Sequence, residues 1–204
     1  IVMAVRKAGE TWWLRAGVFG FGFILLLMMI SPVFISPLFN DYKPLAEGPV
    51  KSAIFSLARA NQIPTDNVVY FDASKQTTRV SANVSGFAGT TQVSLNDNLL
   101  NKTSLPEIKA VMGHEMGHYV LNHSLRLAVY FSLTIMFGFW FVHVVLDKVI
   151  ARFGVKYGIT ERTDPAVLPI ALTVFSFLML LLTPVTNSIV RQAEKEADLY
   201  GLNS

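Results

Sequence analysis

Three long stretches without a charged side chain constrain this chain more than any other feature. They occupy residues 16–40, 127–146 and 165–190. Each is long enough to supply the roughly 20 apolar residues that a helix needs to cross the hydrocarbon core of a bilayer. Trp12 and Trp13 precede the first stretch, as expected at a membrane–water interface. Three buried helices of a soluble core are the alternative, but 204 residues make a short chain for three such runs. We therefore predict three transmembrane helices in contact with the lipid bilayer.

The composition agrees with a membrane protein and argues against other classes. Only 15% of the residues are charged, against about a quarter in a typical soluble domain. The chain has no cysteine, so it has neither disulfides nor thiolate metal ligands. The net charge of +3 is small, and no dense cluster of lysine and arginine indicates a nucleic-acid partner. The chain begins at Ile1 instead of methionine, which favours a fragment of a longer protein.

Residues 41–123, between the first two stretches, have a different character. Residues 48–62 show helical periodicity, and Pro49 is suited to the first turn of that helix. Ser104 followed by Glu107 is a capping-box signal, which predicts the start of another helix. Three short runs with Gly, Asn and Asp at their ends are typical of strands: residues 67–71, 78–87 and 91–95.

The helix predicted after Ser104 carries His114 and His118, with Glu115 next to the first of them. Residues four apart lie on one face of an α-helix, so both imidazoles can bind one metal ion. A glutamate beside the first ligand can hold and deprotonate the water in the open position of a zinc site. Two surface histidines on an amphipathic helix are the alternative. The pattern predicts a hydrolytic zinc site with Glu115 as the general base.

A catalytic zinc of this kind needs a third protein ligand, and two regions of the sequence offer one. His123 lies half a turn away from His114 on a continuous helix, so we expect it to face away and to cap the helix end. Glu194 and Asp198, just beyond the third charge-free stretch, share a helical face and suit a ligand and its carboxylate partner. We expect Glu196 to point elsewhere and to be solvated. The alternative for this whole stretch is that its charged residues only mark where the helix leaves the membrane. Two predicted spans separate the histidine pair from Glu194, which places both on the same side of the membrane.

These motifs resemble those of the integral-membrane zinc metallopeptidases related to CAAX prenyl protease 1 and heat-shock protease X. The resemblance covers nearly the whole chain and is carried by VMGHEMGHYVLNH and RQAEKEAD. The stretches ISPLFNDYKPLAEG, DASKQTTRVSAN and VSLNDNLL favour the CAAX prenyl protease branch. The resemblance implies that His114, His118 and Glu194 bind one Zn²⁺ ion. It also implies that Glu115 is the general base and that Asp198 is an acid, acting as a proton donor or as the partner of a ligand.

The expected fold is a mainly α membrane protein with three transmembrane helices and a small α+β zinc-peptidase domain that contains a short β-sheet. The chain is expected to have four consecutive parts. They are the N-terminal flank and first transmembrane helix (1–40), the zinc-peptidase domain (41–123), the second transmembrane helix and a loop (124–164), and the third transmembrane helix with the ligand helix (165–204).

The function implied by the resemblance is a membrane-embedded zinc endopeptidase that cleaves membrane-associated or prenyl-type protein substrates. A non-catalytic membrane scaffold or chaperone is the alternative, although a scaffold has no need of a base beside its metal. The resemblance implies a location in the bacterial inner membrane with the zinc site facing the cytoplasm. The distribution of charge does not indicate an orientation, because lysine and arginine occur on both sides of the spans. Relatives often have Ser-Asn-Ala in the strand that receives substrate, where this chain has Ser81 in the place of the asparagine. The edge of that strand can pair with an extended peptide, or the strand is an ordinary member of the sheet.

Overall fold

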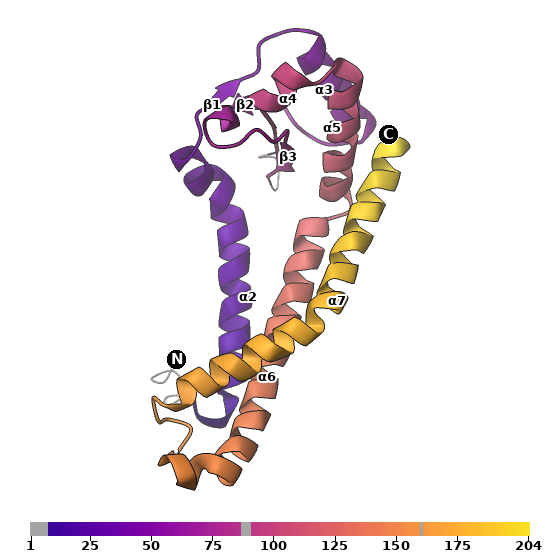
Figure 1. The fold of residues 1–204 in the computed structure, drawn as a ribbon. Helices are drawn as coiled ribbons and strands as arrows, with labels where there is room; N and C mark the ends of the chain where they lie inside the picture. The colour runs from indigo at the N-terminus through magenta and orange to yellow at the C-terminus, as the bar shows by residue number, and fades with distance from the viewer. Residues whose placement is uncertain (1–7, 87–90, 160) are drawn as a thin grey trace. The chain divides into compact units, whose positions relative to one another are not determined.

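The computed structural model describes residues 8–86, 91–159 and 161–204 (Figure 1). Contacts within the chain divide it into two compact units. The first unit consists of Ile1–Leu25 and Leu127–Ile189, and the second of Leu26–Arg126 and Val190–Ser204. Each unit therefore combines stretches that are far apart in the sequence. The division of the chain into four consecutive parts stays a prediction.

Among the described residues, three helices are long and apolar enough to cross a membrane: Gly9–Ile30, His123–Lys156 and Val167–Leu202. They correspond to α2 (Trp12–Ile30) with the preceding turn η1 (Gly9–Thr11), to α6 (His123–Tyr157) and to α7 (Val167–Leu202). Large apolar side chains stay exposed on them, for example Phe19 at 75% and Leu180 at 67%. Such exposure suits a surface that faces lipid. The prediction of a mainly α membrane protein with three transmembrane helices is confirmed by length, composition and fold.

Two glycines allow close helix packing within the first unit. A Cβ atom on Gly17 of α2 would lie 2.7 Å from Cγ of Met136, and one on Gly138 of α6 would lie 2.6 Å from Cε2 of Phe175. Small residues at such positions are typical of helix contacts in membranes, where packing replaces the hydrophobic effect as the driving force.

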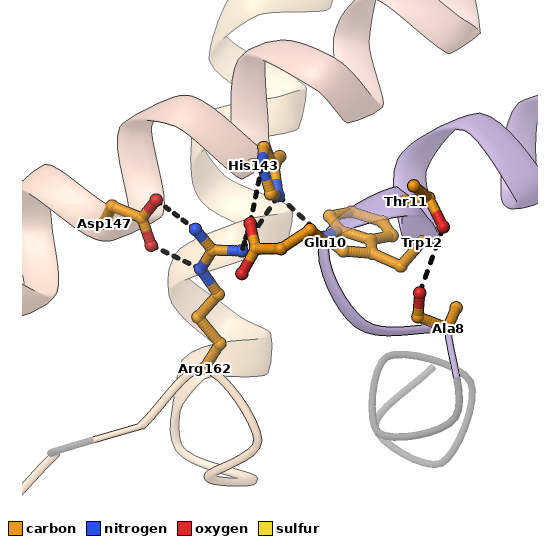
Figure 2. Close-up of polar contacts among 7 residues, drawn as sticks. All are labelled: Ala8, Glu10, Thr11, Trp12, His143, Asp147 and Arg162. Atoms are coloured by element: carbon orange, nitrogen blue, oxygen red, sulfur yellow. Dashed lines mark hydrogen bonds and ion pairs between the residues drawn. The ribbon is translucent and has the colours of Figure 1, made fainter.

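A cluster of polar side chains joins the start of the first membrane helix, α6 and the loop after α6 (Figure 2). Arg162, in the loop after α6, pairs in a bidentate manner with the carboxylate of Asp147. Its Nη1 atom also donates to Oε2 of Glu10 at 3.1 Å and lies 3.1 Å from Nδ1 of His143. Trp12 donates its indole N–H to the same His143 nitrogen at 3.2 Å. Because both neighbours are donors, Nδ1 of His143 is the acceptor, and the ring proton lies on Nε2. The His143 ring is thus hydrogen-bonded within the first unit.

The second unit contains a four-stranded sheet with the order β1-β2-β4-β3. The strands are β1 (Tyr42–Pro44), β2 (Asn67–Phe71), β3 (Ala82–Ser85) and β4 (Gln92–Asn96). The β2–β4 pair is parallel and the other two pairs are antiparallel. All three predicted strands are present, although the strand predicted over 78–87 is regular only in β3, and Phe87 lies outside the described residues. Strand β1 was not predicted, because three residues are too few to show an alternating pattern.

Three helices cover or flank this sheet: α3 (Pro49–Ala60), α4 (Asp97–Lys102) and α5 (Leu105–Val120). Their apolar faces and the inner face of the sheet form one core, which includes Ile54, Val93, Leu95, Leu99, Met112 and Met116. The carboxylate of Glu107 accepts hydrogen bonds from the backbone N–H and from Oγ of Ser104, each at 2.7 Å. The predicted capping signal therefore does mark the first turn of α5. This cap fixes where the helix with the histidine pair begins.

Candidate metal centre

The candidate site lies between α5 and the last turns of α7, both within the second unit (Figure 1). Glycines let the two helices approach until their backbones touch. A Cβ atom on Gly117 would lie 3.1 Å from Cα of Ala197, and one on Gly201 would lie 2.8 Å from the backbone nitrogen of His114. A Cβ atom on Gly113 would lie 3.1 Å from Cα of Gly201. The absence of these side chains brings the carboxylates of α7 within reach of the imidazoles of α5.

Three possible ligand atoms converge at this contact. Nε2 of His114 lies 3.0 Å from Nε2 of His118. Oε2 of Glu194 lies 3.4 Å from the first of these nitrogens and 3.6 Å from the second. A tetrahedral zinc ion with bonds of about 2.0–2.1 Å separates neighbouring ligand atoms by about 3.3 Å. The triangle therefore has the size that zinc requires, and two imidazoles with one carboxylate are a donor set typical of hydrolytic zinc.

Burial shifts the pKa values of two residues at the triangle. Burial lowers the pKa of His118, although Glu194 opposes the shift, and a neutral imidazole is the form that binds metal. Burial also raises the pKa of Glu115 to about 7; the positive charge of His114 opposes this rise and the negative charge of Glu194 adds to it. Glu115 is half-buried and directly follows His114. A cation at the triangle would favour its carboxylate form.

Asp198 contacts the other side of the His114 ring. Its Oδ1 atom lies 2.8 Å from Nδ1 of His114. When Nε2 of that ring offers its lone pair to a metal, the ring proton is on Nδ1 and is donated to the Asp198 carboxylate. The carboxylates of Glu194 and Asp198 thus reach opposite nitrogens of one imidazole, as expected from their position on one helical face.

The expectations that His123 faces away from the histidine pair and that Glu196 is solvated are wrong. His123 is 1% exposed, and its Nδ1 atom lies 2.9 Å from Nδ1 of His118, so it does not face away from the site. Glu196 lies 3.0 Å from the other ring nitrogen of His123 and accepts a hydrogen bond from Arg126 at 2.7 Å, so it is not simply solvated. The error for His123 came from assuming that one continuous helix runs from His114 to His123. Helix α5 ends at Val120, and Asn122 adopts a φ of 53° before α6 begins.

The sequence does contain a signal for this break. Asparagine tolerates the left-handed region better than most residues and commonly follows the last turn of a helix. Asn122 after the apolar end of α5 therefore indicates a helix end. The turn redirects the chain, so that the histidine after it returns toward the helix that it has just left.

Helices of membrane-spanning length together with a His-His-Glu group are features of an integral-membrane metalloprotein. The model of peptidase family M48 matches residues 44–204. The model of the CAAX prenyl protease N-terminal region, described as five membrane helices, matches residues 1–41. The chain belongs to peptidase family M48. The resemblance inferred from the motifs is therefore confirmed.

Individual relatives agree with this assignment. The uncharacterized metalloprotease YhfN of Bacillus subtilis is 34% identical over 198 residues, which cover 97% of this chain and 46% of that protein. CAAX prenyl protease 1 of Saccharomyces cerevisiae is 32% identical over 90% of this chain and 44% of its own length. The crystal structure of S. mikatae Ste24p has a TM-score of 0.78 and 26% identity, and the match covers 99% of this chain and 50% of that one. The chain thus spans about half the length of these relatives.

Proposed function

We propose that this chain forms the zinc-binding part of a membrane-embedded metalloendopeptidase. The observation that carries the proposal is the triangle of Nε2 of His114, Nε2 of His118 and Oε2 of Glu194, with Glu115 beside it. A zinc ion held by these three residues supplies Lewis acidity toward a water molecule and the scissile carbonyl. The remaining steps depend on the side chains of the chain itself.

Glu115 is the proposed general base. Its carboxylate accepts a proton from the water that attacks the scissile carbonyl carbon, and it then gives this proton to the amine when the C–N bond breaks. Burial raises the pKa of Glu115 to about 7, and a cation at the triangle would lower it toward the carboxylate form that accepts the proton. The position of Glu115 directly after His114 supports this role.

Asp198 is proposed to hold the His114 ring in the orientation that directs Nε2 toward the metal. The distance of 2.8 Å between its Oδ1 atom and Nδ1 of His114 supports this role. A carboxylate at this position also makes the imidazole a stronger ligand. A role as proton donor to the leaving group is the second possibility that the family resemblance implies.

The proposed substrates are polypeptides that are membrane-associated or prenylated, as the name of the yeast relative suggests. Strand β3 pairs with β4 and, within the described part of the chain, with no other strand. It also packs against α5, which carries the histidine pair. The free edge of β3 is therefore suited to an extended peptide that adds one strand to the sheet. We further propose a multi-pass location in the bacterial inner membrane with the centre facing the cytoplasm; the Bacillus relative supports a bacterial setting.

The substitution Glu115→Gln in the complete protein tests the proposal. The variant is expected to keep its zinc, because the ligands are untouched, and to lose peptide hydrolysis, because an amide cannot accept the proton. Zinc content by metal analysis and cleavage of a peptide, with and without a prenyl group, are measured in detergent. Full activity of the variant contradicts the mechanism. Zinc binding by the wild type without cleavage of either peptide favours the scaffold.

A further inference from the structure

We propose that His123 and Glu196 form a hydrogen-bonded relay that fixes the ring of His118 and thereby positions the second metal ligand. The inference rests on the proposed function, because it assigns Nε2 of His118 to the metal. His123 and Glu196 are positioning residues in this proposal. Neither belongs to the His-His-Glu triangle.

The direction of each hydrogen bond follows from the role of His118. If Nε2 of His118 offers its lone pair to the metal, the proton of this neutral ring lies on Nδ1. That N–H donates to Nδ1 of His123 at 2.9 Å, so the proton of His123 lies on its Nε2 atom. Nε2 of His123 then donates to Oε2 of Glu196 at 3.0 Å. One assignment at the metal thus sets the tautomers of both rings.

The far end of the relay is firmly held. Arg126 donates to Oε2 of Glu196 at 2.7 Å, and Gln192 donates to Oε1 at 2.9 Å. A carboxylate paired with a guanidinium is a charged acceptor, which makes stronger hydrogen bonds than a neutral one. The negative charge of Glu196 also polarises the chain of imidazoles and makes His118 a stronger ligand.

Burial excludes the simpler explanation that His123 only fills space. Its side chain is 1% exposed, and both ring nitrogens have a partner. A buried polar ring is costly unless it is hydrogen-bonded, and an apolar side chain could fill the same volume without that cost. The two metal ligands are therefore supported differently. His114 contacts a carboxylate directly, whereas His118 reaches one through a second imidazole.

The test compares the zinc affinity of variants of the complete protein, purified in detergent and titrated with Zn²⁺ against a chelator. We expect His123→Leu to raise the dissociation constant about 10–100-fold, as is typical when the partner of a ligand is lost. His123→Asn should recover most of the affinity, because its amide oxygen can accept from Nδ1 of His118. Glu196→Ala should weaken binding by a similar factor, and Lys195→Ala, the same change on the exposed neighbouring residue, should not.

The melting temperature of the metal-free protein separates positioning from folding, because the relay predicts a loss of affinity in a chain that still folds. If His123→Leu does not fold, Glu196→Ala decides between the outcomes. Affinity within about twofold of the wild type in the folded variants overturns the relay, and complete loss of zinc in His123→Asn makes His123 a direct ligand instead. If His118→Ala binds Zn²⁺ as tightly as the wild type, the proposed metal site itself is wrong. If His118→Ala loses Zn²⁺ affinity but the variants of His123 and Glu196 do not, only the relay is refuted and the proposed metal site stands.

Discussion

Asp198 places its Oδ1 atom 2.8 Å from Nδ1 of His114, although 84 positions separate the two residues in the sequence. The opposite nitrogen of the same ring faces Glu194 at 3.4 Å. One imidazole is therefore held between two carboxylates that lie one turn apart on a single helix. This arrangement gives the two carboxylates different tasks, and their removal should have different effects.

The substitution Glu194→Ala removes a proposed metal ligand, whereas Asp198→Ala removes the proposed partner of a ligand. We expect the first variant to lose zinc affinity by well over 100-fold and the second by about 10–100-fold. Asp198→Ala should therefore retain part of its zinc but lose most of its peptidase activity. Titration with Zn²⁺ against a chelator measures the affinities and peptide cleavage measures the activity, with Lys195→Ala as the control on the same helix. Zinc retention by Glu194→Ala equal to that of the wild type would show that the third ligand lies elsewhere.

Gly201→Ala should disrupt the proposed metal centre without changing any ligand side chain. The new methyl group would lie 2.8 Å from the backbone nitrogen of His114, so the two helices must separate. The Glu194 carboxylate moves away with its helix, and zinc affinity should fall. Gly22→Ala is the matched control, since a Cβ atom at that position has nothing within 4 Å. The idea fails if both variants bind Zn²⁺ with the affinity of the wild type.

Glu107 should make the stability of the protein depend on pH. Hydrogen bonds from the backbone N–H and the hydroxyl of Ser104 lower the pKa of Glu107 below its ordinary value of 4.5. Because the folded pKa is depressed, this stabilisation is fully present above pH 4.5 and is lost as the pH falls through the folded pKa. The difference in melting temperature between the wild type and Glu107→Ala should therefore shrink below that pH. A difference that stays constant from pH 7 to pH 3 is the contrary result.

Arg162→Ala should destabilise the helices of the first unit. The substitution leaves Asp147 and Glu10 without their guanidinium partner and removes one of the two donors to His143. Arg162 is 21% exposed but Asp147 is 49% and Glu10 80% exposed, so we expect a loss of about 1 kcal/mol, the upper value for exposed ion pairs. Arg162→Lys should recover only part of this, because an ammonium group cannot make the bidentate pair. Thermal unfolding in detergent, with Lys148→Ala as the control, measures the effect, and an unchanged melting temperature in Arg162→Ala would contradict it.

Local patterns were enough to predict most of the fold and the first half of the site. The three spans follow from charge-free length, and strands β2 and β4 follow from short runs between turn residues. His114 and His118 are four residues apart on one helix, so their convergence needs no tertiary information. Glu194 needed a topological argument in addition, since an even number of spans had to return the chain to the same side.

The remaining features depend on geometry that one-dimensional counting does not contain. His123 was misplaced because two residues of turn, ending in Asn122 at a φ of 53°, replace the assumed helix. Glu196 was misplaced because two of its partners, His123 and Arg126, come from the start of α6, about 70 positions earlier in the sequence. The helix contact itself has a sequence signal, the small-xxx-small spacing of Gly113 and Gly117. That signal becomes informative only when the partner helix is known.

The glycines of this contact also affect how substitutions in the chain are interpreted. Positions 113, 117 and 201 perform no chemistry, yet a methyl group at any of them meets the neighbouring helix at 3.1 Å or less. Whether a substitution is tolerated at these positions therefore depends on the volume of the new side chain and not on its chemical reactivity. A mutational scan scored by activity alone would place them beside the ligands and the base. Their whole contribution, however, is the space that a side chain would otherwise occupy.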